Sequence, residues 1–149
     1  MEKSFRTLRG FLAGKEPEED TYFAYSASLR IAGEISDINE ISETLGLSPT
    51  HSHRKGESRV AEASPYRQDM WSYSPSVEGS APLYKHLDAL WLKLKPHKPY
   101  LLELKKSLNV DVFCGYRSNC DHAGVEVPHT SLEMFIELEI PFGISIIVT

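Results

Sequence analysis

The 149-residue sequence contains only two cysteines, which is too few for a disulfide framework. No stretch approaches about 18 uninterrupted apolar residues, the length that a membrane-spanning helix requires. Basic residues are also scarce: 16 Lys and Arg stand against 21 Asp and Glu, and the formal charge is −5. This balance argues against broad nucleic-acid binding, which needs a basic surface. With 41% hydrophobic residues, the composition is that of an ordinary globular protein.

The motifs of common catalytic and nucleotide-binding sites are missing as well. The sequence has no G-x-x-x-x-G-K-[ST] loop, no G-x-G-x-x-G fingerprint and no G-x-S-x-G nucleophile elbow. Its densest group of carboxylates, in residues 16–20, lies in a polar linker where these groups should titrate normally. The sequence therefore predicts a protein that is not an enzyme and that uses no cofactor.

The first 20 residues differ in pattern from the rest of the chain. Phe5, Leu8 and Leu12 recur at helical spacing among basic residues, which predicts a short amphipathic extension, followed by an acidic linker. We expect the extension to lie on the protein surface, with docking to a membrane surface or a partner as the alternatives. Charged residues interrupt its apolar positions, so no secretory signal is present and we expect a cytoplasmic protein. Residues 21–149 are expected to form a single α+β domain.

The first half of this domain has clear strand and helix patterns. Residues 21–35 alternate between apolar and small polar side chains, which predicts a half-buried strand. A helix should follow, capped by Ser36 or Asp37 and ended by Gly46. Residues 48–68 read as a long polar passage, and residues 69–74 as a second strand. Pro82 opens the clearest amphipathic helix of the chain, with apolar residues at Leu83, Leu87, Leu90, Trp91 and Leu94.

The second half predicts a similar order of elements. Residues 110–116 alternate as a third strand, Thr130 and Glu133 form a capping-box pattern at the start of a helix, and residues 144–148 predict a final strand. The order strand, helix, strand therefore occurs twice. This predicts two pseudo-repeated β-α-β units in a ferredoxin-like α+β sheet with helices packed on one face. The expected core places Trp71 and the helix stripe against Leu29, Ile31, Val112 and Ile146.

Several short motifs occur in an order that resembles a known family. They are Leu29-Arg30-Ile31, Leu45-Gly46-Leu47-Ser48-Pro49-Thr50, Lys55-Gly56, Trp71-Ser72-Tyr73-Ser74, and Leu83 and Leu87 with Leu90. From about Tyr22 onward the chain is similar to the family catalogued as domain of unknown function 4279. The resemblance implies a small, mostly bacterial, stand-alone domain, and it brings no catalytic motif with it.

Cysteine and histidine residues give two candidate metal sites, and we favour the structural explanation for both. Cys114, Cys120, His122 and His129 are close in sequence, but they lack the tight Cys-x2–4-Cys spacing of a zinc knuckle. Cys114 falls on the apolar side of its strand, where a buried thiol is expected. The pair His51 and His53 has no third ligand at a fixed offset, so we expect an exposed loop pair and no metal.

Two groups of residues remain as candidates for recognising an anion. The polar face of the predicted sheet should collect Ser26, Ser28, Arg30, Ser72, Ser74, Asp111 and Arg117, and an arginine among serines needs either water or an anion. The loop that contains His51, His53, Arg54, Lys55 and Arg59 is the only locally basic part of the domain, and Arg and Lys beside a glycine can hold a phosphate or carboxylate. The alternative for this loop is a solvated connection.

The acidic charge, the domain length and the lack of catalytic spacing predict a non-catalytic binding domain. Its partner would be another protein, as for bacterial immunity and defence proteins. The first alternative is a small-ligand or nucleotide-binding domain that recognises an anionic group through Arg30 and the basic loop. The second alternative is an enzyme of a kind that its motifs do not reveal. The sequence leaves open a homodimer, as well as a partner surface on the acidic helix around Glu133 and Glu137.

Overall fold

The computed structural model describes residues 21–120 and 124–149, so the expected N-terminal extension and linker lie outside the described residues, as does His122. Five strands form one sheet in the order β2-β3-β1-β4-β5. Their bounds are β1 Phe23–Gly33, β2 His51–His53, β3 Asp69–Tyr73, β4 Asn109–Ser118 and β5 Ile144–Val148. Neighbouring strands are antiparallel except for β4 and β5, which are parallel.

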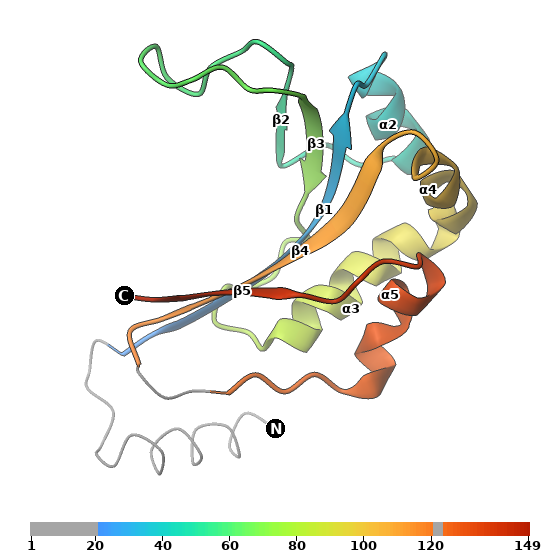
Figure 1. Cartoon of the computed structure of the whole chain (residues 1–149). Helices are drawn as coiled ribbons and strands as arrows, with labels where there is room; N and C mark the ends of the chain where they lie inside the picture. Colours follow the sequence, from blue (N-terminus) through green and yellow to red (C-terminus); the bar gives the residue numbers. More distant parts are fainter. Residues whose placement is uncertain (1–20, 121–123) are drawn as a thin grey trace.

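The helices gather on one side of this sheet, as Figure 1 shows. They are α2 Ile38–Leu45, α3 Leu83–Leu94, α4 Lys98–Leu104 and α5 Glu133–Glu137, with short 3-10 turns at Lys95–His97 and His129–Leu132. No helix within residues 21–120 and 124–149 has both the length and the apolarity needed to cross a bilayer.

Helix α2 begins and ends at the residues that its sequence predicts. The Asp37 side chain accepts a hydrogen bond from the backbone N–H of Asn39, which satisfies a donor in the first turn. Gly46 ends the helix in the left-handed conformation, with a φ of 66° that a residue without a Cβ adopts at little cost. Ile41 and Leu45 face the core.

Helix α3 supplies the centre of the core, as predicted. Leu87 and Leu90 are both 0% exposed, and Trp71 on β3 is 0% exposed beneath the helix layer. Leu29, Ile31 and Val112 are buried as expected, but Ile146 is 61% exposed and its assignment to the core is wrong. The reason is its position on β5, which lies at the margin of the sheet beyond the helices that cover the centre.

The α+β class and the helices on one face are confirmed, but the pseudo-repeated ferredoxin-like arrangement is not. The predicted units correspond to β1-α2-β3 and β4-α5-β5, yet their strands pair differently. Strands β1 and β3 are antiparallel neighbours, whereas β4 and β5 are parallel neighbours. The sheet also has a fifth strand, and its order β2-β3-β1-β4-β5 is not the order of a ferredoxin-like sheet.

Two local predictions also need correction. The polar passage before β3 contains a short strand, β2, which pairs with β3 through His51, Ser52 and His53. The helix expected to begin at the Thr130 capping box begins instead as a 3-10 turn, and α5 starts at Glu133 without a side-chain cap. In both places, pairing or packing with a segment that is distant in sequence determines the backbone conformation. Local sequence patterns do not contain this information.

Candidate functional site

The candidate site is the open face, by which we mean the side of the sheet opposite the helices. Residues that pair across neighbouring strands point to the same side. The register therefore aligns one row across four strands: His51 on β2, Ser72 on β3, Arg30 on β1 and Asp111 on β4. This central row lies on the open face, because the alternate residues Leu29 and Ile31 are buried on the helix side.

The predicted collection of polar residues is present on this face. Ser28 and Ser74 join their hydroxyl groups in a hydrogen bond of 2.6 Å. Ser26 lies across from Gly115, and Arg117 lies two residues further along β4. Period-two alternation therefore identified the open face correctly from the sequence.

Arg30 is held by a partner within the protein. Its Nε and one terminal nitrogen each donate to a different carboxylate oxygen of Asp111, both at 2.9 Å. The guanidinium carbon also lies 5.0 Å from the centre of the Phe113 ring. The hydrogen bond to Asp111 is the main reason that the pKa of Arg30 is raised. The sequence predicted that Arg30 needs either water or an anion; the anion is the Asp111 carboxylate, and this pair leaves no uncompensated charge at Arg30.

Next to this pair, the open face is hollowed by about 300 Å³. The walls of the hollow come from β1, β4 and β5, and its lining includes Ser26, Phe113, Gly115, Arg117 and Ser145. A Cβ atom on Gly115 would lie 2.7 Å from the Ser26 hydroxyl oxygen and 3.2 Å from the Phe113 ring. The absence of a side chain at Gly115 thus leaves room for the Phe113 ring and the Ser26 hydroxyl group beside it.

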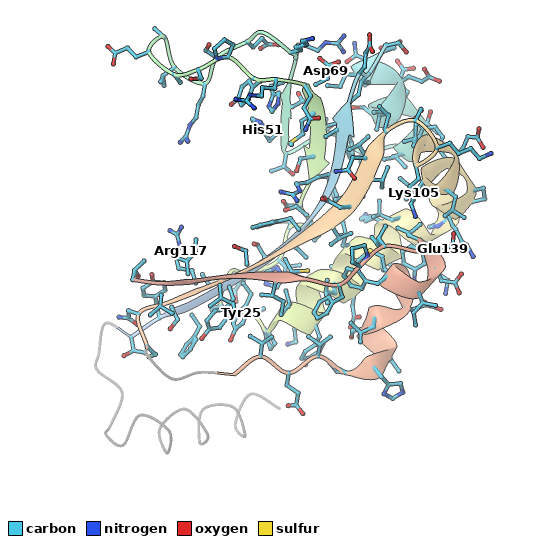
Figure 2. All side chains as sticks on the ribbon, in the orientation of Figure 1. Tyr25, His51, Asp69, Lys105, Arg117 and Glu139 are labelled. Atoms are coloured by element: carbon cyan, nitrogen blue, oxygen red, sulfur yellow. The ribbon has the colours of Figure 1, made fainter. Side chains whose placement is uncertain are left out.

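Arg117 gives the hollow an exposed positive charge. Figure 2 shows Arg117 and Tyr25 on opposite sides of the sheet, with Arg117 away from the helices. The sequence placed Arg117 on the polar face but did not assign it to the anion site. Its position in the alternation of β4 was the available signal, and the hollow beside it depends on strand pairing that the sequence does not state.

The two histidines of the predicted loop lie on strand β2, at the margin of the open face. His51 Nε2 and His53 Nδ1 are 3.0 Å apart, and the Tyr66 ring stacks on His53 with 3.5 Å between ring centres. His53 is 9% exposed, so the expectation of an exposed loop pair is wrong for this residue. Burial, followed by the nearby His51 ring, lowers the pKa of His53. Tyr66 was missed because it is 13 residues from His53 in the printed sequence and in a polar loop.

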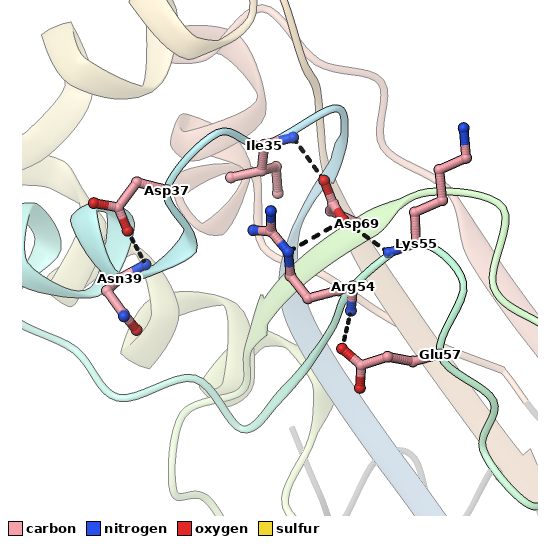
Figure 3. A network of polar contacts seen from close by, with 7 residues as sticks. All are labelled: Ile35, Asp37, Asn39, Arg54, Lys55, Glu57 and Asp69. Carbon is pink, nitrogen blue, oxygen red and sulfur yellow. Dashed lines mark hydrogen bonds and ion pairs between the residues drawn. The ribbon is translucent and has the colours of Figure 1, made fainter.

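The rest of the basic loop serves a structural network, drawn in Figure 3. The Asp69 carboxylate accepts hydrogen bonds from the backbone N–H groups of Lys55, at 2.8 Å, and Ile35, at 2.9 Å. These two bonds are the main causes that lower the pKa of Asp69. Arg54 pairs with Asp69 at 3.5 Å, and its backbone N–H donates to Glu57. The loop is therefore fastened to the sheet through Asp69.

The structure divides the residues that the sequence grouped as one anion site. Arg30 and His51 share the central row of the open face. Arg54 instead pairs with Asp69, beyond the end of β2, while the Lys55 and Arg59 side chains are exposed in the connection between β2 and β3. We therefore centre the candidate site on the open face and leave the loop outside it.

Of the four candidate metal ligands near Cys114, the structure describes Cys114, Cys120 and His129, whereas His122 lies outside the described residues. Cys114 is 1% exposed in the core, and burial raises the pKa of its thiol to about 12. Cys120 is partly buried and has a free thiol. His129 lies in a 3-10 turn after the undescribed residues 121–123. Among the residues that the structure describes, no group of three or more His, Cys, Asp or Glu side chains is placed to hold a metal ion.

The acidic surface around Glu133 is tied to neighbouring helices. Glu133 accepts a 2.6 Å hydrogen bond from the Trp91 indole nitrogen, and this bond is the first cause that lowers the pKa of Glu133. Lys95 approaches the same carboxylate at 3.4 Å. Lys98 pairs with Glu137. These carboxylates hold helices together, which makes the surface a weaker candidate than the open face.

A family model described as "Domain of unknown function (DUF4279)" matches residues 22–149. No curated protein matches the chain, and no solved structure does.

Proposed function

Because the chain belongs to the DUF4279 family, whose description assigns no activity, we propose from the geometry of the site that it is a non-catalytic domain that binds another protein through its open face. The observation that carries the proposal is a sheet face that no helix within residues 21–120 and 124–149 covers and that presents polar groups in fixed positions. The pair of Arg30 with Asp111 and the bond of Ser28 to Ser74 hold these groups in place before a partner arrives. Preorganised groups lose less conformational entropy on binding.

The charges of the open face indicate which part of the partner it receives. Arg30 is neutralised by Asp111, whereas Arg117 is exposed at the hollow. The hydroxyl groups of Ser26 and Ser145 line the same hollow. A guanidinium with hydroxyl donors matches a carboxylate, so we place an acidic side chain of the partner at Arg117. An immunity or defence protein that holds another protein is one form of this function.

A matched pair of charge reversals tests this proposal. Arg117→Glu changes the open face, and Lys93→Glu makes the same charge change at an exposed position of α3 on the helix side. Tagged full-length proteins are incubated with extract of the cells in which the chain occurs naturally, and the proteins they retain are compared. We expect wild type and Lys93→Glu to retain the same protein and Arg117→Glu to lose it. Equal retention by both variants would show that the open face is not the binding surface.

A small molecule with an anionic group is the second candidate, and the hollow favours it. Its volume of about 300 Å³ reaches the lower end of the range for small-molecule sites. Native mass spectrometry of the purified full-length chain separates the two proposals. A bound metabolite lost in Arg117→Glu and kept in Lys93→Glu supports the small-ligand function, whereas a chain that carries no small molecule and retains a protein supports the first.

A further inference from the structure

The two margins of the sheet are protected very differently. Strand β2 at one margin has three residues and is followed directly by the charged residues Arg54 and Lys55. Strand β5 at the other margin has the sequence Ile-Ser-Ile-Ile-Val, without charge or proline. Figure 1 shows β5 beside β4, with no strand of the described chain on its outer side. Proteins usually block such margins with charges, proline or very short strands, and β5 has none of these.

One hydrogen bond identifies which backbone groups of β5 point away from the sheet. The backbone N–H of Thr149 donates to the Ser118 carbonyl of β4 at 3.0 Å. Successive residues of a strand direct their backbone groups to opposite sides, so Ile147 and Ser145 also face β4. Ile144, Ile146 and Val148 therefore direct their N–H and C=O groups away from the sheet, where a further strand can pair with them.

The side chains of the same residues lie on one face. Ile146 pairs in register with Tyr116 and Val148 with Ser118, which places both on the helix side of the sheet. Ile146 is 61% exposed and Val148 is 52% exposed, because the helices do not extend over this margin. Ile146 and Val148 thus combine outward backbone groups with exposed β-branched side chains.

We propose that β5 pairs antiparallel with β5 of a second copy of this chain, which joins the two sheets into one. With Ile146 on the two-fold axis, Ile146 lies opposite its own copy, and Val148 lies opposite Ile144 of the partner subunit. Each such pair exchanges two backbone hydrogen bonds, so about six form across the axis. The cross-strand pairs also cover Ile146 with its own copy and Val148 with Ile144 of the partner subunit.

A second copy fits this margin because the strand is complementary to itself. An isologous contact requires that the same patch serve both subunits, and an uncharged strand of alternating outward residues meets that requirement without like-charge repulsion. The contact is short, and interfaces below about 1,200 Å² are typically weak, so the dimer should depend on protein concentration. The two-fold axis perpendicular to the sheet would leave both open faces on the same side of the dimer, free for the function proposed above.

Sedimentation of the full-length chain at increasing concentration tests the proposal. Wild type is expected to approach twice its mass of 16.8 kDa. Ile146→Lys places two like charges at the axis and should raise the dimer dissociation constant by at least about a hundredfold. Ile136→Lys, at a 73% exposed residue of α5, is the matched control and should dimerise as wild type does.

A second variant covers the possibility that Ile146→Lys fails to fold. Val148→Pro removes an N–H that points outward and is not needed within the sheet, so this variant should fold and remain monomeric. Arg117→Glu should dimerise normally, which separates this contact from the open face. A wild-type chain that stays monomeric throughout the concentration range would overturn the proposal. So would a dimer that Ile146→Lys and Val148→Pro leave intact, or one that Ile136→Lys disrupts equally.

Discussion

Truncation of Leu87 to alanine is the most direct perturbation of the core that supports the open face. Leu87 is 0% exposed and lies on the face of α3 that packs against the sheet. The substitution removes buried carbon atoms and leaves a cavity between the helix and the strands. Truncating a buried leucine costs about 2–5 kcal/mol, and the cost is larger where the walls of the cavity cannot collapse. Because a hydrogen-bonded sheet forms one wall here, we expect about 3–5 kcal/mol.

The same helix provides a matched control for this substitution. Leu92 is 76% exposed, so Leu92→Ala removes the same atoms from solvent and should change the free energy of unfolding by less than about 0.5 kcal/mol. Urea denaturation followed by tryptophan fluorescence measures both variants. With a urea dependence of roughly 2 kcal/mol per M, the Leu87→Ala midpoint should fall by about 1.5–2.5 M. If Leu92→Ala were the more damaging variant, or if Leu87→Ala left the midpoint unchanged, the assigned helix face would be wrong.

Three further predictions concern single groups of the described chain. Cys114, whose thiol has a pKa of about 12, should not react with a thiol reagent in the native protein at neutral pH. Both cysteines should be modified once urea unfolds the protein. Rapid labelling of Cys114 in the native protein would contradict its burial. The folded state lowers the pKa of His53, so the unfolded chain binds a proton first and stability should fall as pH drops below about 6.5 toward the folded-state pKa. His53→Phe should lessen this dependence in urea titrations at successive pH values, and an unchanged slope would exclude His53 as its source. Finally, a double-mutant cycle of Arg30→Ala and Asp111→Ala should give a coupling of about 0.5–1 kcal/mol in the free energy of unfolding, since both side chains are partly exposed. Strictly additive effects of the two substitutions would show that the pair does not act as a unit.

The sequence predicted those parts of the fold in which one element carries its own periodic pattern. The stripe of α3 and the alternation of β1 each follow from residue spacing, and Gly46 marks the end of α2 through its backbone freedom. Ile146 was misplaced because an apolar strand pattern is the same for a central strand and for one at the margin. Strand β2 was missed because its three residues are polar and its pairing comes from β3.

The sequence predicted only the part of the candidate site that follows from the residue pattern within single strands. Alternation was sufficient to place the polar residues on one face. The partner of Arg30, however, is 81 residues away in sequence, and only strand register reveals that Asp111 lies opposite it. The hollow beside Arg117 likewise requires three strands to be adjacent. Assignments that depend on long-range pairing are the ones that a single sequence does not supply.

Site-specific photo-crosslinking tests most directly whether the open face is the binding surface. A photoreactive phenylalanine analogue replaces His51, an exposed ring in the central row, or Leu92, an exposed side chain on the helix side. Each full-length protein is irradiated in extract of the cells in which the chain occurs, and adducts are identified by mass spectrometry. We predict an adduct with a single protein from position 51 and none with that protein from position 92. An adduct from position 92 alone, or the same protein crosslinked equally from both positions, would contradict the assignment of binding to the open face.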